Sequence, residues 1–190
     1  DIEFSNGLDQ GSWITGFNMD YADMNLDGRL DIISSVWPSS VYILYQPKYP
    51  YERWNIKKVG SIKPDRLVSV AVADIDNDGD QDIFSGSYSL GSRNKDDIDS
   101  SNKAYGSVVW FQNNSKSWKK NNILRRKRGM YDKWIPIDLD KDNDMDFIGT
   151  RGNSEPFDGV LWLEQLGYDY SQKVFFPARK IDSKSVPFDD

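Results

Sequence analysis

The chain has 190 residues, which is enough to bury a hydrophobic core as one domain or as a short array of repeats. It contains no cysteine and no histidine, which excludes disulfides, zinc–thiolate sites, imidazole metal sites and catalysis by Ser-His-Asp or Cys-His groups. The net charge is −6 at pH 7, and no apolar run approaches the roughly 18 residues that a membrane helix needs.

The first predicted unit covers residues 13–60 and contains the acidic loop DMNLDGRLD at 23–31. The pair Ile32–Ile33 follows the loop, and VYILYQ at 41–46 predicts a strand because it is rich in β-branched and aromatic residues. A segment centred on Trp54, YERWNIKKV, comes next. The unit therefore predicts four short strands: one entering the loop, one leaving it, the aromatic strand and the one around Trp54.

The second unit, residues 61–126, repeats this order. The alternating segment RLVSVAVA at 66–73 predicts a strand that enters the loop DIDNDGDQD at 74–82. The aromatic strand VVWFQN starts at Val108, and a segment centred on Trp118 follows it. Residues 89–106 are polar and rich in glycine and serine, so they predict an extended surface loop.

The third unit, residues 127–180, contains the loop DLDKDNDMD at 138–146 and the aromatic strand VLWLEQ at 160–165. Between them, RGNSEPFDG offers a candidate ligand pocket in which the arginine would clamp a carboxylate or sulfate. Hydrogen bonds within the loop are the alternative role for its polar residues, Arg151, Asn153, Glu155 and Asp158. Residues 174–190 could begin a fourth unit.

All three acidic loops fit D-x-[DN]-x-D-[GN]-x-x-D, and they hold three, five and five aspartates, or 13 of the chain's 30 acidic residues. Such a loop wraps oxygen ligands around a hard cation, and a flexible all-oxygen site favours calcium over magnesium. Positions 1, 3, 5 and 9 offer side-chain oxygens, position 7 offers its carbonyl, and position 6 makes a sharp turn. We predict about three calcium ions, one per loop, with the ligands Asp23, Asn25, Asp27, Arg29 and Asp31; Asp74, Asp76, Asp78, Asp80 and Asp82; and Asp138, Asp140, Asp142, Asp144 and Asp146.

These loops are not EF-hands, since position 12 is Ser34, Ser85 or Gly149 rather than glutamate and the flanking segments are strands. The loop with its aromatic strand resembles instead the FG-GAP/VCBS repeat, the blade of calcium-binding β-propellers in integrin α-subunit heads and in many secreted bacterial proteins. The resemblance covers roughly residues 13–176, and residues 149–165 are most similar to the bacterial members.

The resemblance implies an all-β fold of about three four-stranded antiparallel propeller blades, in which the loop positions bind structural calcium. Asn25 gives the first loop one carboxylate fewer, so weaker binding is expected there, and Asn143 replaces the glycine of the third loop. Because propellers close with four to eight blades, we expect a chain that is part of a larger propeller or that pairs with further blades.

The function expected from these features is a calcium-stabilised binding module outside the cell, at the cell surface or in the periplasm. The first residue is Asp and no signal peptide is seen, so a mature or trimmed chain is expected. The favoured partner is a carbohydrate, either a polysaccharide or a cell-surface glycan, with anionic glycans among the candidates. An adhesion or scaffold propeller that binds a protein is the alternative. A polysaccharide-active enzyme is a third reading, either a hydrolase with Glu155 and Asp158 as its carboxylate pair or a lyase that uses Tyr and Arg. Neither nucleic-acid binding nor membrane insertion is expected.

Three further groups of residues have two readings each. Trp110 and Trp162 occupy equivalent repeat positions and are expected to pack between blades. The tryptophans without an obvious repeat position belong either to the core or to an exposed aromatic platform: Trp13, Trp37 and Trp134. The basic run at 125–128 is a solvated turn or a site for an acidic glycan.

Overall fold

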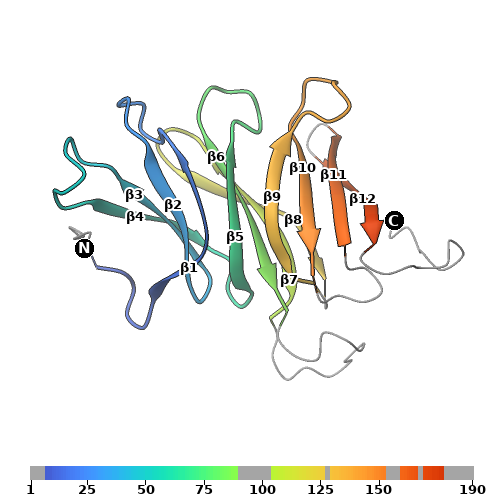
Figure 1. Ribbon diagram of the computed structural model, residues 1–190, viewed down its shortest axis with the longest axis horizontal. Coiled ribbons are helices and arrows are strands. Elements are labelled where there is room, and N and C mark those ends of the chain that lie inside the picture. Colours follow the sequence, from blue (N-terminus) through green and yellow to red (C-terminus); the bar gives the residue numbers. More distant parts are fainter. Residues whose placement is uncertain (1–6, 90–103, 127–128, 153–158, 167–168, 178–190) are drawn as a thin grey trace, which may run out of the picture.

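The computed structural model describes residues 7–89, 104–126, 129–152, 159–166 and 169–177, and this part of the chain is all-β with no helix (Figure 1). It forms three four-stranded antiparallel sheets, and in each of them the strands are ordered as in the chain. The first sheet contains β1 (Trp13–Ala22), β2 (Asp31–Trp37), β3 (Ser40–Tyr45) and β4 (Asn55–Ser61). The second contains β5 (Arg66–Ala73), β6 (Asp82–Tyr88), β7 (Gly106–Asn113) and β8 (Trp118–Arg126). The third contains β9 (Tyr131–Ile137), β10 (Asp146–Arg151), β11 (Gly159–Leu166) and β12 (Asp169–Pro177).

The sheets are the predicted propeller blades, and the middle strands of the first two sheets are buried on both faces. Such strands read as continuous apolar runs, as VYILY of β3 and VVWF of β7 do. The last strands of the first two sheets, β4 and β8, consist mostly of exposed and partly exposed residues, as expected of a sheet edge. Residues 174–177 pair with β11 as part of β12, so they complete the third blade and do not begin a fourth.

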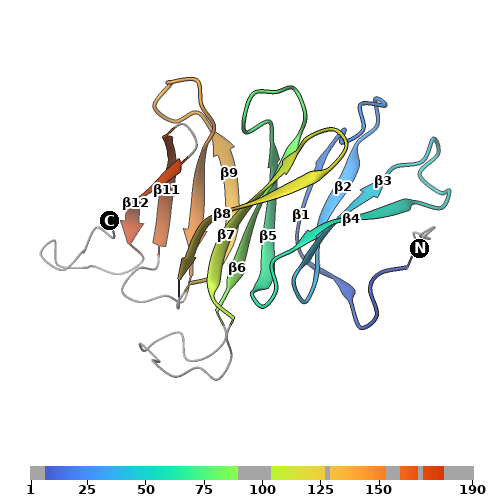
Figure 2. The same ribbon diagram turned by 180° about the vertical axis from the view of Figure 1, so that it is seen from behind.

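The first strands of the three blades lie side by side, and Figure 2 shows the blades fanning out from them. Hydrogen bonds join these strands. The Val72 amide of β5 donates to Asp20 of β1 at 2.9 Å, and the Ser69 hydroxyl donates to the Tyr131 carbonyl of β9 at 2.6 Å. The side-chain amide of Asn18 in β1 donates to the Asp132 carbonyl of β9 at 2.8 Å.

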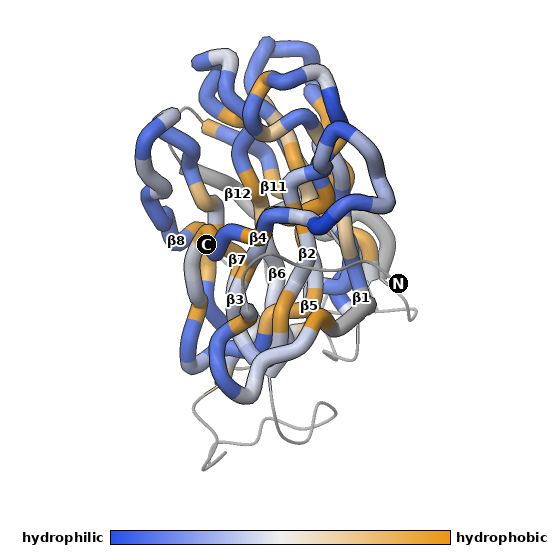
Figure 3. Tube along the Cα trace, turned by 90° about the vertical axis from the view of Figure 1, so that its left-hand side faces the viewer, coloured by the Kyte–Doolittle hydropathy of each residue, from blue (hydrophilic) through white to orange (hydrophobic). Residues whose placement is uncertain are grey.

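Two hydrophobic cores lie between the blades. The core between the first and second includes Ile33 and Ile43 on one side and Val70 and Phe111 on the other. The core between the second and third is aromatic: Phe84 and Phe147 stack at 3.7 Å, with Trp110, Tyr131 and Trp134 around them. Figure 3 shows the hydrophobic residues along the strands and the hydrophilic ones mainly in the connecting loops.

Candidate metal centres

The three acidic loops join β1 to β2, β5 to β6 and β9 to β10, and all of them lie at the same end of the molecule, the top of Figure 1. Each loop places two residues in the left-handed region of the backbone. Position 6 has a φ of 82° at Gly28, 93° at Gly79 and 73° at Asn143, which confirms the turn expected there. Position 4 also has a positive φ, at Leu26, Asn77 and Lys141, and the pattern did not indicate this because no glycine marks it.

Carboxylates at positions 1 and 5 accept hydrogen bonds from the loop's own amides. In the second loop Asp74 accepts from the amides of Asp78 and Gly79 at 3.1 and 3.0 Å, and Asp78 accepts from the amide of Asp80 at 2.9 Å. Asp23 and Asp27 make the same bonds in the first loop. These bonds hold the carboxylates in a tight turn before any cation is considered.

The carboxylates of positions 1, 3 and 5 converge in the second and third loops. One oxygen from each of Asp74, Asp76 and Asp78 lies within 4.8 Å of the others, and Asp138, Asp140 and Asp142 form an equivalent group. Two oxygens in these groups, Oδ1 of Asp76 and Oδ1 of Asp138, are buried and have no hydrogen-bond partner among the described residues. A set of oxygens alone, some of them unsatisfied, fits a hard divalent cation.

Several carboxylates in these loops have shifted pKa values. In the third loop, loss of solvent and repulsion from Asp142 raise the pKa of Asp140, and the same causes raise the pKa of Asp144 to about 6. In the first loop, desolvation is outweighed by backbone N–H donors, Gly28 among them, and the pKa of Asp23 falls. The third loop therefore holds more unfavourable negative charge than amide donors offset, which is the condition that a cation relieves.

The aspartate at position 9 also joins two segments of its blade through hydrogen bonds, which the sequence pattern did not indicate. Its carboxylate is fully buried in all three loops, and its two oxygens accept amide hydrogen bonds from two separate segments. Asp82 accepts from Ile75 in the loop at 3.2 Å and from Asn113, the last residue of β7, at 2.6 Å. Asp31 accepts from Met24 and Gln46, and Asp146 from Leu139 and Gln165. Burial raises the pKa of Asp31, and it raises the pKa of Asp82 to about 7.

The first loop differs from the other two in charge. Asn25 takes position 3, and the guanidinium of Arg29 forms an ion pair with Asp27. The Nε atom of Arg29 also donates to the Gln46 carbonyl at 3.0 Å. The loop pattern assigns Arg29 only a backbone carbonyl ligand, but its side chain supplies a positive charge to the loop. This charge reduces the need for a cation there.

The second and third loops contact each other. The Asn77 side chain donates to the Asn143 carbonyl at 3.3 Å, and Gln112 of β7 donates to Asp76 at 2.6 Å. The loops that carry the two clusters of three aspartates are therefore hydrogen-bonded to one another. The cluster of the second loop is also hydrogen-bonded to the aromatic strand of its own blade, β7.

The predicted ligand pocket at 151–158 falls mostly outside the described residues, since Asn153, Glu155 and Asp158 are not among them. Arg151, at the end of β10, is 3% exposed, and its guanidinium lies 5.7 Å from the ring of Tyr131. A buried guanidinium offers little surface to a ligand in this arrangement.

The unplaced tryptophans fall into both predicted classes. Trp134 is 1% exposed and belongs to the core between the second and third blades, where Trp110 also packs. Trp13 is 53% exposed and stacks on Trp37 at 5.3 Å, so these two form the exposed aromatic pair.

Of the basic run at 125–128, Arg125 binds the buried carboxylate of Asp65 through two nitrogens at 2.8 and 3.0 Å.

A comparison with protein families bears on these loops directly. The family model described as FG-GAP-like repeat matches residues 23–85, from the start of the first acidic loop through the second loop into β6. Residues 23–85 are an FG-GAP-like repeat segment. The matched segment holds two copies of the acidic loop, and the third blade repeats the same order of strands and loop. No curated protein matches the chain.

Proposed function

We propose that this FG-GAP repeat chain is a calcium-stabilised, non-catalytic binding module that works outside the cell and recognises carbohydrate. The observation that carries the calcium part is the convergence of three carboxylates in each of the second and third loops, with buried oxygens left unsatisfied.

The reason for calcium is electrostatic. Two carboxylates about 4 Å apart repel by on the order of 1 kcal/mol in water and roughly 4 kcal/mol at an effective protein dielectric. The side chains of positions 1, 3, 5 and 9 would hold the ion with position 7 supplying a carbonyl, and the ion would supply the positive charge that offsets this repulsion. The first loop, with Asn25 and the Arg29–Asp27 pair, is the weakest of the three sites.

The proposed location follows from the openness of the loops. Their position 5 residues, Asp27, Asp78 and Asp142, are exposed to solvent. Exposed sites of this kind suit calcium at about 10⁻⁴–10⁻³ M, the range of extracellular modules. No helix in the described part of the chain is long and apolar enough to cross a bilayer.

Carbohydrate is favoured as the ligand because aromatic residues make up 14% of the chain and one pair, Trp13 and Trp37, is stacked with Trp13 exposed. A protein partner or further blades are a second candidate, since the outermost sheets also expose apolar side chains. Those of the first blade are Met19, Tyr21 and Leu30, and those of the third are Ile135, Ile137 and Leu166.

Calorimetric titration of the chelator-treated chain with calcium tests the calcium part. We expect two stronger sites and one weaker site, with little heat from magnesium. Asp78→Asn should weaken one strong site and Asp142→Asn the other. A titration without calcium binding, in a chain that is folded by circular dichroism, would refute the proposal. A glycan array run with millimolar calcium and again with chelator tests the carbohydrate part.

A further inference from the structure

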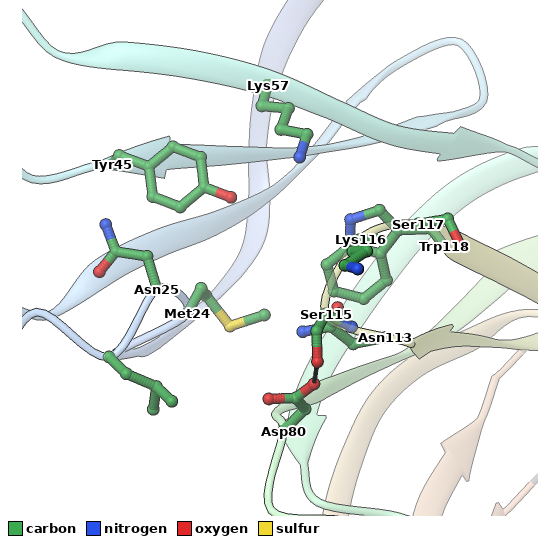
Figure 4. A pocket seen from close by; sticks show the side chains of 11 residues that line it. Met24, Asn25, Tyr45, Lys57, Asp80, Asn113, Ser115, Lys116, Ser117 and Trp118 are labelled. Atoms are coloured by element: carbon green, nitrogen blue, oxygen red, sulfur yellow. Dashed lines mark hydrogen bonds between the residues drawn. The ribbon is translucent and has the colours of Figure 1, made fainter.

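A cleft of about 340 Å³ lies between the first and second blades, at the end of the molecule that carries the acidic loops. One wall is made by residues 24–26 of the first loop together with Tyr45 and Lys57. The other wall is the β7–β8 turn, residues 113–118, with Asp80 of the second loop below it. Figure 4 shows the Tyr45 hydroxyl and the Lys57 ammonium pointing into the space between these walls. The volume is at the lower end of the range of about 300–1,000 Å³ typical of small-molecule sites.

The cleft presents two cations and two aromatic rings. Lys57 and Lys116 are exposed, and neither forms an ion pair with any residue in the described part of the chain. Tyr45 and Trp118 are partly buried and pack against the core between the first two blades, so their rings are held in place from behind. Ammonium groups bind carboxylates or sulfates, and aromatic rings pack against the apolar faces of sugar rings.

The walls of the cleft are built on the acidic loops. On one side the Ser115 hydroxyl donates to Asp80, and Asn113 donates through its side chain to the Gln81 carbonyl at 3.3 Å and through its amide to Asp82 at 2.6 Å. On the other side Asn25, at position 3 of the first loop, accepts from its own loop at 3.1 Å. The position of both walls therefore depends on how the two loops are held.

We propose that this cleft binds an anionic saccharide unit, whose ring packs against Tyr45 and Trp118 and whose carboxylate or sulfate binds Lys57 and Lys116, and that this binding depends on calcium in the adjoining loops. The inference rests on the proposed function, because the loops that form the walls are the calcium sites. It goes beyond that function in giving the saccharide a charge and a location away from residues 151–158.

The dependence on calcium has an electrostatic cause. Without a cation, the two loops that adjoin the cleft hold eight aspartates, one of which, Asp80, lines it; this negative charge opposes the two lysines and repels an anionic ligand. Calcium in these loops offsets that charge and leaves the lysines to dominate the cleft. The coupling is reciprocal, so the saccharide must raise the affinity for calcium by the same factor.

Calorimetric titration with tetragalacturonate, a sulfated tetrasaccharide and neutral cellotetraose, each in excess calcium, tests the proposal. We expect one or both anionic probes to bind and cellotetraose to bind at least about tenfold more weakly. The double variant Lys57→Gln/Lys116→Gln should lose roughly tenfold or more in affinity for the anionic probe. Lys119→Gln is the control for each single variant, Lys57→Gln and Lys116→Gln, since it removes one positive charge from β8 outside the cleft and should bind as the parent chain does.

The outcomes separate this inference from the proposed function. Equal binding of cellotetraose, or unchanged binding by the double variant, would overturn the cleft as an anionic site even if calcium still binds the loops. Undiminished saccharide binding in chelator would overturn the dependence on calcium. Absence of calcium binding itself would overturn the proposed function, and it is measured separately on the same proteins.

Discussion

Asp146 and Asp142 in the third loop are both predicted calcium ligands, but the structure gives them different second roles. Asp146 is buried and accepts amide hydrogen bonds from Leu139 at 3.2 Å and Gln165 at 2.8 Å. Asp142 is exposed and accepts one bond, from the amide of Asp144 at 3.1 Å. Replacing either by asparagine removes one negative charge from the same loop, so the two variants form a matched pair.

In chelator the pair should separate. Asp146→Asn replaces one of the two carboxylate oxygens with an NH2 group that faces a backbone N–H. The change removes one charge-assisted hydrogen bond and leaves a buried donor unpaired, which together cost about 3 kcal/mol of stability. For a chain of this length that corresponds to a fall in melting temperature of roughly 6–12 °C. Asp142→Asn keeps its oxygen acceptor and relieves the repulsion that Asp142 exerts on Asp140 and Asp144, so in chelator it should not destabilise the chain.

Urea unfolding followed by tryptophan fluorescence, with chelator and then with calcium, measures both effects. In calcium both variants should lose stability relative to the parent chain, because each removes a ligand. If Asp146→Asn is as stable as Asp142→Asn in chelator, the buried carboxylate does not join the loop to the end of β11 as described.

Three other substitutions test separate features. Arg29→Ala frees the Asp27 carboxylate from its ion pair, so calorimetry should show tighter calcium binding by the first loop, and an unchanged affinity would contradict the role of that pair. Asn143→Ala should destabilise the chain by about 1 kcal/mol in thermal melts because φ there is 73°, whereas Asn143→Gly should be tolerated; equal stability of the two would count against a strained position 6. Gly149→Ala would place a methyl group 2.2 Å from the buried ring of Trp134 and should cost about 1–3 kcal/mol or more, while a neutral melt would mean that the ring can move aside.

Much of the fold could be predicted from the sequence because the repeat supplies three registered copies of each signal. The loop pattern located the turn at position 6, and the β-branched and aromatic runs located the central strands. The fourth strand of the third blade was expected only by analogy with the other blades, since DYSQKVFFP lacks the tryptophan that precedes or begins its counterparts. Trp134 was ambiguous for the opposite reason: a single tryptophan without a repeat partner carries no information about which face it occupies.

The candidate site was less predictable because its further features depend on partners that residue identity does not reveal. Asp31, Asp82 and Asp146 bind backbone amides from the end of a strand, and any residue there would supply the same N–H group. The cleft between the first two blades joins residues more than 50 positions apart, such as Lys57 and Lys116, which only the packing of two blades brings together. The loop pattern indicates only a backbone carbonyl ligand at Arg29, because the pattern describes metal ligands and not neighbouring charges.

The central claim, that calcium stabilises this chain, is tested most directly by thermal unfolding in calcium, magnesium and chelator. A site that binds only the folded chain adds about 2.7 kcal/mol when free calcium is 100 times its dissociation constant. For a chain of this size that raises the melting temperature by roughly 5–11 °C per site. We predict a rise of this order in calcium and little change in magnesium. Identical melting temperatures in calcium and chelator would contradict the account.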